Sequence, residues 1–308
     1  MDDKAIFAAV KGRTKAKALE GRLPLETVTT IAELRERLRP ARWAGKSIGL
    51  VPTMGYLHRG HATLVDRARD DNDLVVTSVF VNPLQFGPNE DFARYPRDLD
   101  ADRKMLAAHR ADIVFAPTVE EMYPQPIATH IEVEGLSGRL EGERRPGHFR
   151  GVATVVGKLF NVVQPDRAYF GEKDYQQLQV IRRMVADLSF PLEIVGVPTV
   201  RDVDGVALSS RNVYLSPTER SAAQVLSRSL AAAAEAISAG TVDPQKIEAI
   251  VRGVLASEPL ADPDLVAIAA ADTLEPVDPK ALPPAIALMI AVRIGRTRLI
   301  DQRVVAVT

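Results

Sequence analysis

Apolar positions along the chain recur at two different spacings, which together predict strands and helices in regular order. Residues 74–81 form an almost unbroken β-branched run, typical of a strand that is buried on both faces. From His61 onward, Leu64, Val65 and Ala68 return at helical spacing between charged residues. A strand-turn-helix unit is therefore predicted around His61.

The same patterns continue over the first two thirds of the chain. Strands are expected at 47–51, 74–81, 113–116, 168–170 and 192–197, and helices at 31–38 leading into Pro40, from 61, and at 99–109, 152–163 and 175–188. Strands that alternate with helices imply a parallel sheet with right-handed crossovers. This part is predicted to be a Rossmann-like, doubly wound α/β domain, in which ligands bind at the carboxyl ends of the strands.

The pattern changes after about residue 199. Ser216-Pro217-Thr218-Glu219 is a strong helix start before an alanine-rich helix at 221–239, and a second helix is expected at 243–255. Strands are expected at 264–270, 286–294 and 299–305. We therefore predict an N-terminal extension at 1–26, a Rossmann-like domain at 27–198 and a smaller α+β domain at 199–308.

Composition narrows the class of protein. The chain has 308 residues, of which 46% are hydrophobic and 26% charged, as is typical of a soluble globular protein, and its net charge of -1 gives no field that would attract nucleic acid. The longest apolar stretch, 285–292, is too short to span a membrane. Because cysteine is absent, disulfides, thiol nucleophiles and Cys-ligated zinc are excluded. The extension is basic but opens with Asp2 and Asp3 and has no apolar core, so it is not a secretory signal.

The segment 54–61 ends in His-x-Gly-His where the predicted strand passes into the predicted helix. A helix N-terminus offers unpaired N–H groups and a positive dipole end, which favour a phosphate there. Gly55 and Gly60 allow close approach of the backbone, and His58 and His61 can donate to phosphate oxygens. Neighbouring phosphates would raise the pKa of both rings and make them cationic. The same pair could instead bind a metal or simply cap the helix.

Two further clusters follow predicted strands. Asn82 and Gln85 come directly after the buried strand and could hold a small polar substrate, or could simply form a turn. Segment 141–151 combines three arginines and His148 with glycines, which suits a mobile lid over anions or an ordinary solvated loop.

Charged and hydroxyl side chains form the last two clusters. Lys173 would place a point charge on a phosphoryl oxygen, Asp174 could reach a metal or a ribose, and Gln177 lies one turn into the next helix. Ser209, Ser210 and Arg211 would converge on an anion. Each cluster alone is weak evidence for a binding site. All of them, however, are expected at the carboxyl ends of strands in one sheet.

Taken in order and spacing, these motifs closely resemble those of the pantothenate synthetase family, from about Ile31 to the C-terminus. The matching stretches are Met54-Gly55-x-Leu57-His58-x-Gly60-His61, Phe80-Val81-Asn82-Pro83-x-Gln85-Phe86, Arg145-Pro146-Gly147-His148-Phe149-x-Gly151-Val152, Phe170-Gly171-Glu172-Lys173-Asp174 and Ser209-Ser210-Arg211-Asn212. The N-terminal extension has no counterpart in this resemblance.

The resemblance implies an enzyme of the HIGH-motif nucleotidyltransferase superfamily. Such an enzyme condenses pantoate with β-alanine and splits ATP to AMP and pyrophosphate with Mg²⁺, through a pantoyl-adenylate intermediate. Members are typically cytoplasmic homodimers. The partners expected are therefore small molecules and a second copy of the chain, with neither nucleic acid nor membrane.

The resemblance also implies roles for individual residues. The ATP-binding residues would be Met54, Gly55, Tyr56, Leu57, His58, Arg59, Gly60, His61, Gly171, Glu172, Lys173, Asp174, Val200, Leu208, Ser209, Ser210 and Arg211. The catalytic residues would be His58, His61, Lys173 and Arg211, with His61 as proton donor. Gln85 would contact pantoate and β-alanine, and Gln177 and Asn82 would contact pantoate. Glu141, Arg145 and His148 would be lid residues, and the protein ligands of Mg²⁺ are not implied.

Three other functions compete with this interpretation. Another nucleotidyltransferase, such as a cytidylyltransferase, would share the histidine motif but not Asn82-Pro83 or the lid residues. A catalytically silent nucleotide-binding module is disfavoured because the cationic side chains are present together. A tRNA-charging enzyme is disfavoured by the near-neutral charge and by the lack of room for an anticodon-type domain.

Overall fold

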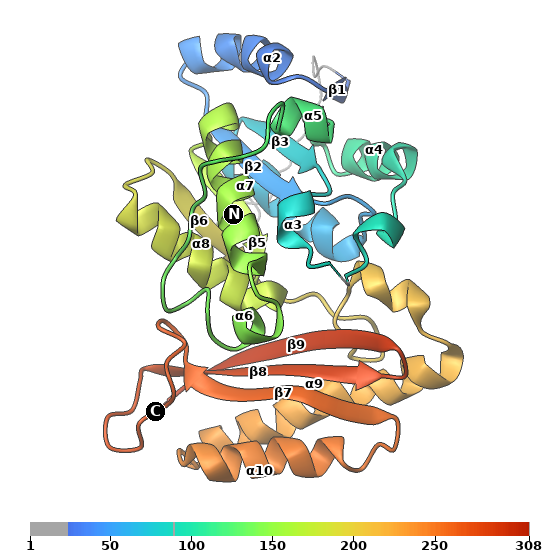
Figure 1. Ribbon diagram of the computed structural model, residues 1–308, viewed down its shortest axis with the longest axis vertical. Coiled ribbons are helices and arrows are strands. Elements are labelled where there is room, and N and C mark those ends of the chain that lie inside the picture. Colours follow the sequence, from blue (N-terminus) through green and yellow to red (C-terminus); the bar gives the residue numbers. More distant parts are fainter. Residues whose placement is uncertain (1–23, 89, 308) are drawn as a thin grey trace, which may run out of the picture.

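The chain is built around two β-sheets, which lie one above the other in Figure 1. In this computed structural model, which describes residues 24–88 and 90–307, the larger sheet has six parallel strands in the order β1-β4-β3-β2-β5-β6. The smaller sheet is antiparallel, in the order β7-β8-β9. The predicted fold class, a Rossmann-like doubly wound parallel sheet with a smaller C-terminal α+β part, is confirmed.

The elements follow one another in the alternating order that the sequence predicted. The strands are β1 Glu26–Val28, β2 Ile48–Thr53, β3 Leu74–Val79, β4 Ile113–Phe115, β5 Arg167–Gly171, β6 Glu193–Val197, β7 Ala261–Ala270, β8 Ala285–Ile294 and β9 Thr297–Ala306. The α-helices are α2 Ile31–Trp43, α3 Arg59–Asp71, α4 Leu99–Ala108, α5 Val119–Met122, α6 Glu141–Arg144, α7 His148–Val163, α8 Tyr175–Asp187, α9 Pro217–Ser238 and α10 Pro244–Leu255. Short 3-10 helices are η1 Pro83–Gln85, η2 Phe92–Arg94, η3 Glu172–Asp174 and η4 Ser210–Tyr214.

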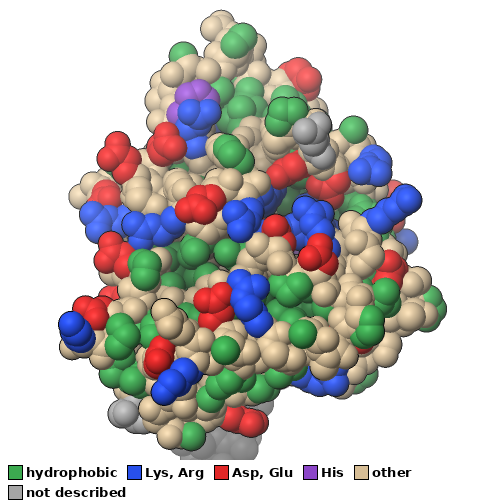
Figure 2. Space-filling model, turned by 60° about the horizontal axis from the view of Figure 1, so that its bottom comes forward, with side chains coloured by type: hydrophobic (Ala, Val, Ile, Leu, Met, Phe, Trp, Pro, Cys, Tyr) green, Lys and Arg blue, Asp and Glu red, His purple; other side chains and the backbone are tan. Residues whose placement is uncertain are grey.

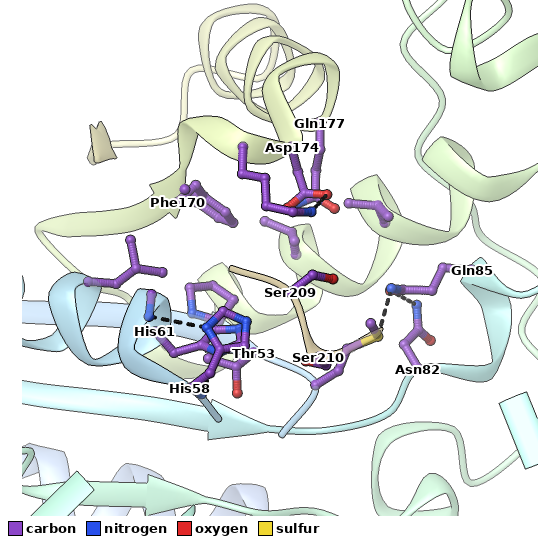
Figure 3. Close-up of a pocket in the computed structure, with 18 of the residues that line it drawn as sticks. Thr53, His58, His61, Asn82, Gln85, Phe170, Asp174, Gln177, Ser209 and Ser210 are labelled. Atoms are coloured by element: carbon purple, nitrogen blue, oxygen red, sulfur yellow. Dashed lines mark hydrogen bonds and ion pairs between the residues drawn. The ribbon is translucent and has the colours of Figure 1, made fainter. Parts of the chain in front are cut away.

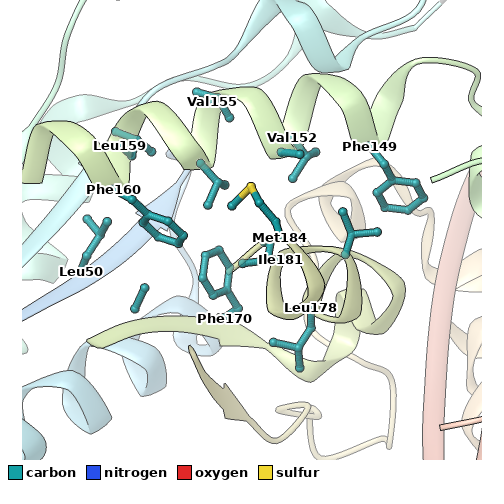
Figure 4. Packing of buried hydrophobic residues seen from close by; sticks show 14 of the residues in the cluster. Leu50, Phe149, Val152, Val155, Leu159, Phe160, Phe170, Leu178, Ile181 and Met184 are labelled. Carbon is teal, nitrogen blue, oxygen red and sulfur yellow. The ribbon is translucent and has the colours of Figure 1, made fainter. Parts of the chain in front are cut away.

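Helices cover both faces of the parallel sheet. On one face α3 and α4 pack against β2, β3 and β4 through a cluster that includes Val65 and Leu106. On the other face α2, α7 and α8 pack through a larger core, where Phe160 and Phe170 lie beside Met184 (Figure 4). Because both faces are covered, the strands can be apolar on both sides, which explains the unbroken β-branched run of β3.

The smaller sheet is also buried on both faces. Ile286, Leu288 and Ile290 of β8 pack with α9 and α10, whereas Ala287 and Met289 join the core of the parallel sheet. Successive residues of a strand point to opposite faces. The continuous apolar run of β8 therefore joins the two halves of the protein.

Several predicted boundaries were wrong by a few residues. Helix α2 continues through Pro40 to Trp43, because Pro40 is exposed and solvent can bond the carbonyl left without a donor. Helix α7 begins at His148 rather than at residue 152, since Gly147 takes a left-handed conformation, φ 83°, and starts the helix there. Strand β3 ends at Val79, and β1 was missed because three residues give too little pattern.

The predicted domain boundaries stay predictions. The expected N-terminal extension falls mostly outside the described residues, and β1 begins at Glu26, its last residue. The expected helix start at Ser216 is confirmed: Ser216 and Glu219 form a reciprocal capping box at the start of α9. Within residues 24–88 and 90–307 no helix is both long and apolar enough to cross a membrane. On the face shown in Figure 2, basic and acidic side chains lie among one another.

We expect Gly151→Ala to destabilise the fold by about 1–3 kcal/mol, the usual cost of overpacking. A Cβ at Gly151 of α7 would lie 2.1 Å from the Leu84 carbonyl oxygen of η1, and backbone cannot give way as a side chain can. Urea denaturation would measure the loss. The matched control is Gly253→Ala, at an exposed position of α10 with no atom within 4 Å, which should gain about 0.4–1 kcal/mol. Equal gains in both variants would contradict the close packing of α7 on η1.

Candidate active site

A cleft opens at the carboxyl ends of β2 and β5, the two central strands of the parallel sheet. Chain connections run in opposite directions from this point, since β2 is followed by β3 on one side and β5 by β6 on the other. Open α/β sheets bind ligands at such a switch point. The segments 198–200 and 208–211, which lead toward the smaller sheet, form the remaining wall.

A buried carboxylate holds the turn that follows β2. Asp102 of α4 is only 3% exposed and accepts hydrogen bonds from the backbone N–H groups of Tyr56, at 2.9 Å, and Leu57, at 2.7 Å. Burial raises the pKa of Asp102, and the two N–H donors oppose that rise. Sequence analysis missed Asp102, because an acidic residue in the first turn of a helix usually serves only the helix dipole.

His58 and His61 cap α3 and face the cleft at the same time. The backbone N–H of Gly60 donates to Nδ1 of His58 at 3.1 Å, and the N–H of His58 donates to Nδ1 of His61 at 3.3 Å. Since a backbone amide can only donate, both Nδ1 atoms are acceptors and the ring proton lies on Nε2. A Cβ at Gly60 would lie 2.9 Å from the His58 ring, so a larger residue here would push that ring out of its capping position. The capping alternative is therefore confirmed, and both rings also line the cleft, whereas the phosphate-binding interpretation stays a prediction.

The surroundings of both rings lower their pKa values, which favours the neutral form at pH 7. Burial, followed by the charge of Lys173, lowers the pKa of His58 to about 4. Burial, followed by the neighbouring His58 and then Lys173, lowers the pKa of His61 to about 3. The expectation that phosphates make both rings cationic concerns the loaded site and stays a prediction. Protonation of either Nδ1 would break its bond to the backbone amide, which opposes that change.

Amide side chains line the opposite wall of the cleft. Asn82, which is 1% exposed, donates through Nδ2 to Oε1 of Gln85 at 3.1 Å and to the carbonyl of Gly151 at 3.1 Å. Nε2 of Gln85 faces the sulfur of Met54 at 3.0 Å. Figure 3 shows this pair across the cleft from the two histidines. Gln85 therefore presents the donor end of its amide to the cleft.

The turn after β5 brings charge to the same cleft. Lys173 and Asp174 of η3 lie 3.8 Å apart, and Gln177 follows in the first turn of α8. Figure 3 shows Asp174 and Gln177 above, with Ser209 and Ser210 between the two histidines and the pair of Asn82 and Gln85. The positive N-terminal end of α8 points to this edge, which suits a phosphate or ribose group.

The two arginines expected to meet anions are already paired with carboxylates. Arg145 forms a bidentate pair with Glu90, with both N···O distances 2.7 Å. Arg211 contacts Asp91 at 3.1 and 3.3 Å. Although burial alone would raise the pKa of Glu90, the hydrogen bonds and charge of Arg145 lower it. Glu90 and Asp91 were missed because their segment showed no motif.

Segment 141–151 is anchored rather than free of contacts. Glu141 forms a bidentate pair with Arg298 of β9, at 2.6 and 2.8 Å, so α6 is tied to the smaller sheet. His148 contacts the carbonyl of Gln85 through Nδ1 at 2.8 Å. The segment is therefore a bridge between the cleft and the second sheet, and its predicted motion stays a prediction.

Most of the predicted site residues come together in one cleft. The lining includes Met54, His58, Gly60, His61, Asn82, Gln85, Arg145, His148, Gly171, Lys173, Asp174, Gln177, Val200, Leu208, Ser209, Ser210 and Arg211. Glu141 lines a smaller adjoining cavity against the second sheet. The predicted residues that do not line the cleft are Gly55, Tyr56, Leu57, Arg59 and Glu172.

Two of the predicted residues outside the cleft have structural contacts of their own. The backbone N–H of Tyr56 is held by Asp102, and Arg59 donates to the carbonyl of Arg201 at 3.0 Å. Sequence analysis did not single out Thr53, Tyr95 or Thr199, which help to line the cleft without any recognisable motif. In the described part of the chain no group of three or more His, Asp or Glu side chains could hold a metal ion.

The fold and the cleft define a nucleotide-binding α/β protein of the class that carries a histidine motif at the start of the first helix after a central strand. A sequence profile of the Pantoate-beta-alanine ligase family matches residues 26–304. The pantothenate synthetase of Rhizobium rhizogenes is 59% identical over 281 residues, which cover 91% of this chain and 96% of that protein. The chain belongs to the pantoate-β-alanine ligase family.

Solved structures show the same likeness. The crystal structure of pantothenate synthetase from Thermus thermophilus is 53% identical with a TM-score of 0.85, covering 90% of this chain and 98% of that chain. The pantoate-β-alanine ligase of Francisella tularensis, solved in complex with β-γ ATP and β-alanine, is 32% identical with a TM-score of 0.72, covering 91% and 97%. The family resemblance read from the motifs is thus confirmed over most of the chain.

The stability of the protein should fall as the pH drops from about 6.5 to about 4. Burial lowers the pKa of His58 and of His148 to about 4 and that of His61 to about 3. In this window the unfolded chain takes up protons that the folded protein does not, so protonation favours unfolding. Urea denaturation at pH 7 and pH 5 would measure the drop, which should shrink in His58→Asn. The control His130→Asn, at an exposed position, should keep the full drop. An unchanged drop in His58→Asn would argue against a neutral, half-buried His58.

Proposed function

We propose that this chain catalyses the ATP-dependent condensation of (R)-pantoate with β-alanine, giving pantothenate, AMP and pyrophosphate. The observation that carries the proposal is that the cleft has a positively charged side and an uncharged side. His58, His61 and Lys173 supply donors and positive charge on one side, and Gln85 supplies an uncharged donor on the other. The first side suits a polyphosphate, and the second suits a small hydroxy acid beside it. Membership of the family and the ATP and β-alanine complex of the Francisella relative support the assignment.

The chemistry requires activation of a carboxylate. A carboxylate is a poor acylating agent toward an amine, so one pantoate oxygen first attacks the α-phosphorus of ATP. The bond from that phosphorus to the bridging oxygen of pyrophosphate breaks, and pantoyl adenylate forms. The amine of β-alanine, without its extra proton, then attacks the acyl carbon, the acyl–phosphate C–O bond breaks, and AMP leaves with its electron pair. No protein nucleophile is needed, in keeping with a chain that lacks cysteine.

The residues of the cleft would act by placement and by electrostatics. The Nε2–H groups of His58 and His61 would donate hydrogen bonds to phosphate oxygens. The role of His61 as proton donor to the departing pyrophosphate, which the resemblance implies, would in addition require the phosphates of the loaded site to protonate its ring. Lys173 and Arg211 would neutralise charge that builds up there. Gln85 and Gln177 would orient pantoate, and well-oriented reactions reach effective molarities of ~10⁵ M or more. Arg145 now pairs with Glu90, and Arg211 with Asp91. When substrate binds, its anionic groups would take the place of these carboxylates beside the two arginines.

Three finer points belong to the same proposal. Mg²⁺ is typically bound by substrate phosphates with one or two carboxylates, and Asp174 at the cleft fits that donor set. The ion would neutralise phosphate charge. The resemblance also supports a homodimer in the cytoplasm.

Incubation with ATP, Mg²⁺, pantoate and β-alanine should release AMP, and omission of pantoate should abolish that release. His61→Ala should lower pantoate-dependent ATP–pyrophosphate exchange by about 10²- to 10³-fold, because it removes a donor at the developing charge. The control His109→Ala, whose ring pairs with Asp66 on the surface, should keep full exchange. AMP released without pantoate, or unchanged exchange in His61→Ala, would rule out the assignment; a screen of other acids and nucleotides would then test for another nucleotidyltransferase.

Gln85→Ala should raise the apparent KM for pantoate by about tenfold or more, as expected for loss of a hydrogen bond to a charged group. It should also impair the use of β-alanine, while the KM for ATP stays within about twofold. Steady-state kinetics with each substrate varied in turn would measure both. The control Gln245→Ala removes an exposed amide of α10 and should change neither constant. A Gln85→Ala variant impaired only toward ATP would refute the role given to Gln85.

A further inference from the structure

Tyr123 lies outside every motif in the sequence, yet its hydroxyl reaches the amide pair of the cleft. It is the first residue after the short helix α5, which follows β4. Its hydroxyl donates to Oδ1 of Asn82 at 2.9 Å. Asn82 in turn donates to Gln85, so a chain of two hydrogen bonds joins Tyr123 to the side chain proposed to hold pantoate.

Every hydrogen-bonding position of the Asn82 side chain is occupied. Its two N–H groups donate to Gln85 and to the carbonyl of Gly151, and its oxygen accepts from Tyr123 and from the N–H of Leu84. Of the two bonds to that oxygen, the one from Tyr123 is shorter, 2.9 against 3.3 Å. Asn82 therefore holds Gln85, and the orientation of the Asn82 amide is fixed by Tyr123 together with the backbone groups of Leu84 and Gly151.

The direction of these bonds decides which end of Gln85 meets the substrate. The two ends of an amide have nearly the same shape, but one donates and the other accepts. Because Asn82 occupies Oε1 of Gln85, the donor Nε2 faces the cleft beside the sulfur of Met54. A carboxylate or hydroxyl oxygen of pantoate would be bound by that donor and repelled by the opposite end.

The ring of Tyr123 is itself held in place from two sides. Nζ of Lys158 lies 5.4 Å above the ring and donates to the carbonyl of Met122, while Phe80 packs at 6.1 Å between ring centres. Burial raises the pKa of Tyr123, so the hydroxyl keeps the proton that it donates. The phenol is thus a fixed donor, aimed from a third element of the fold.

We propose that Tyr123 is a positioning residue for pantoate, which acts through Asn82 to keep the donor end of Gln85 turned into the cleft. The inference rests on the proposed function, in which Gln85 binds pantoate. It assigns a role in substrate recognition to a side chain that does not itself line the cleft.

Tyr123→Phe removes one oxygen atom and leaves the ring in place. It should lower kcat/KM for pantoate by about three- to tenfold, the effect of one neutral hydrogen bond, while kcat/KM for ATP stays within about twofold. In a Gln85→Ala background the same substitution should change kcat/KM for pantoate less than about twofold, because the group through which Tyr123 acts is gone. Purely structural damage would instead lower both substrate constants and would persist in that background.

The matched control is Tyr169→Phe. Tyr169 is a buried tyrosine whose hydroxyl bonds Asn72 at 2.7 Å and Asp71 at 3.1 Å, away from the cleft. Its variant should lose thermal stability but keep both kinetic constants. Equal losses toward pantoate and ATP in Tyr123→Phe, or an undiminished loss in the double variant, would overturn the positioning role while leaving the proposed function intact. If Gln85→Ala alone leaves pantoate use unchanged, the role of Gln85 fails first, and that of Tyr123 fails with it.

Discussion

The N-terminal amides of α3 must find acceptors outside the helix, and the site depends on how they do so. A helix leaves its first N–H groups without internal partners. Here the N–H of Gly60 is bonded by the ring of His58, and the N–H of His58 by the ring of His61. Because Nδ1 of each ring is used in this way, Nε2 must carry the proton and face the cleft. One local constraint therefore caps the helix and sets the tautomer of both rings, which line the same cleft.

The same principle recurs on the opposite wall. Asn82 has no spare hydrogen-bonding capacity, and this leaves Gln85 only one way to present its amide. Asp102 similarly uses its carboxylate to hold the turn at Tyr56 and Leu57. Saturated buried polar groups tend to be rigid, since any rotation would leave a donor or an acceptor unpaired. The cleft is thus prepared for substrate by residues that do not all face it.

Charge in the cleft is balanced before any ligand enters. Arg145 and Arg211 pair with Glu90 and Asp91, whose carboxylates occupy positions that substrate anions could take. The smaller sheet contributes through the pair of Glu141 with Arg298 and through Met289 in the shared core. The smaller sheet therefore anchors segment 141–151 beside the cleft without lining the cleft itself. Binding would exchange internal ion pairs for pairs with substrate.

The sequence by itself determined the fold class and most of the cleft. The β-branched run at 74–81, the helical spacing after His61 and the capping residues at Ser216 are local signals, and each element that they predicted is present. The His-x-Gly-His and Asn-Pro-x-Gln motifs follow strands, so a parallel sheet was enough to bring His61 and Gln85 to one edge. Family membership was also recognisable, because the motifs keep their order and spacing.

Only the tertiary structure decided which groups support those motifs. Asp102, Glu90 and Tyr123 carry no sequence pattern, and their roles arise from contacts with residues 41 to 55 positions away, namely Tyr56, Arg145 and Asn82. The surroundings of the two histidines lower their pKa values, mainly through desolvation, and no spacing in the sequence could reveal this. The physical reason is that spacing reflects local periodicity, whereas burial, charge pairing and amide orientation depend on which segments the fold brings together.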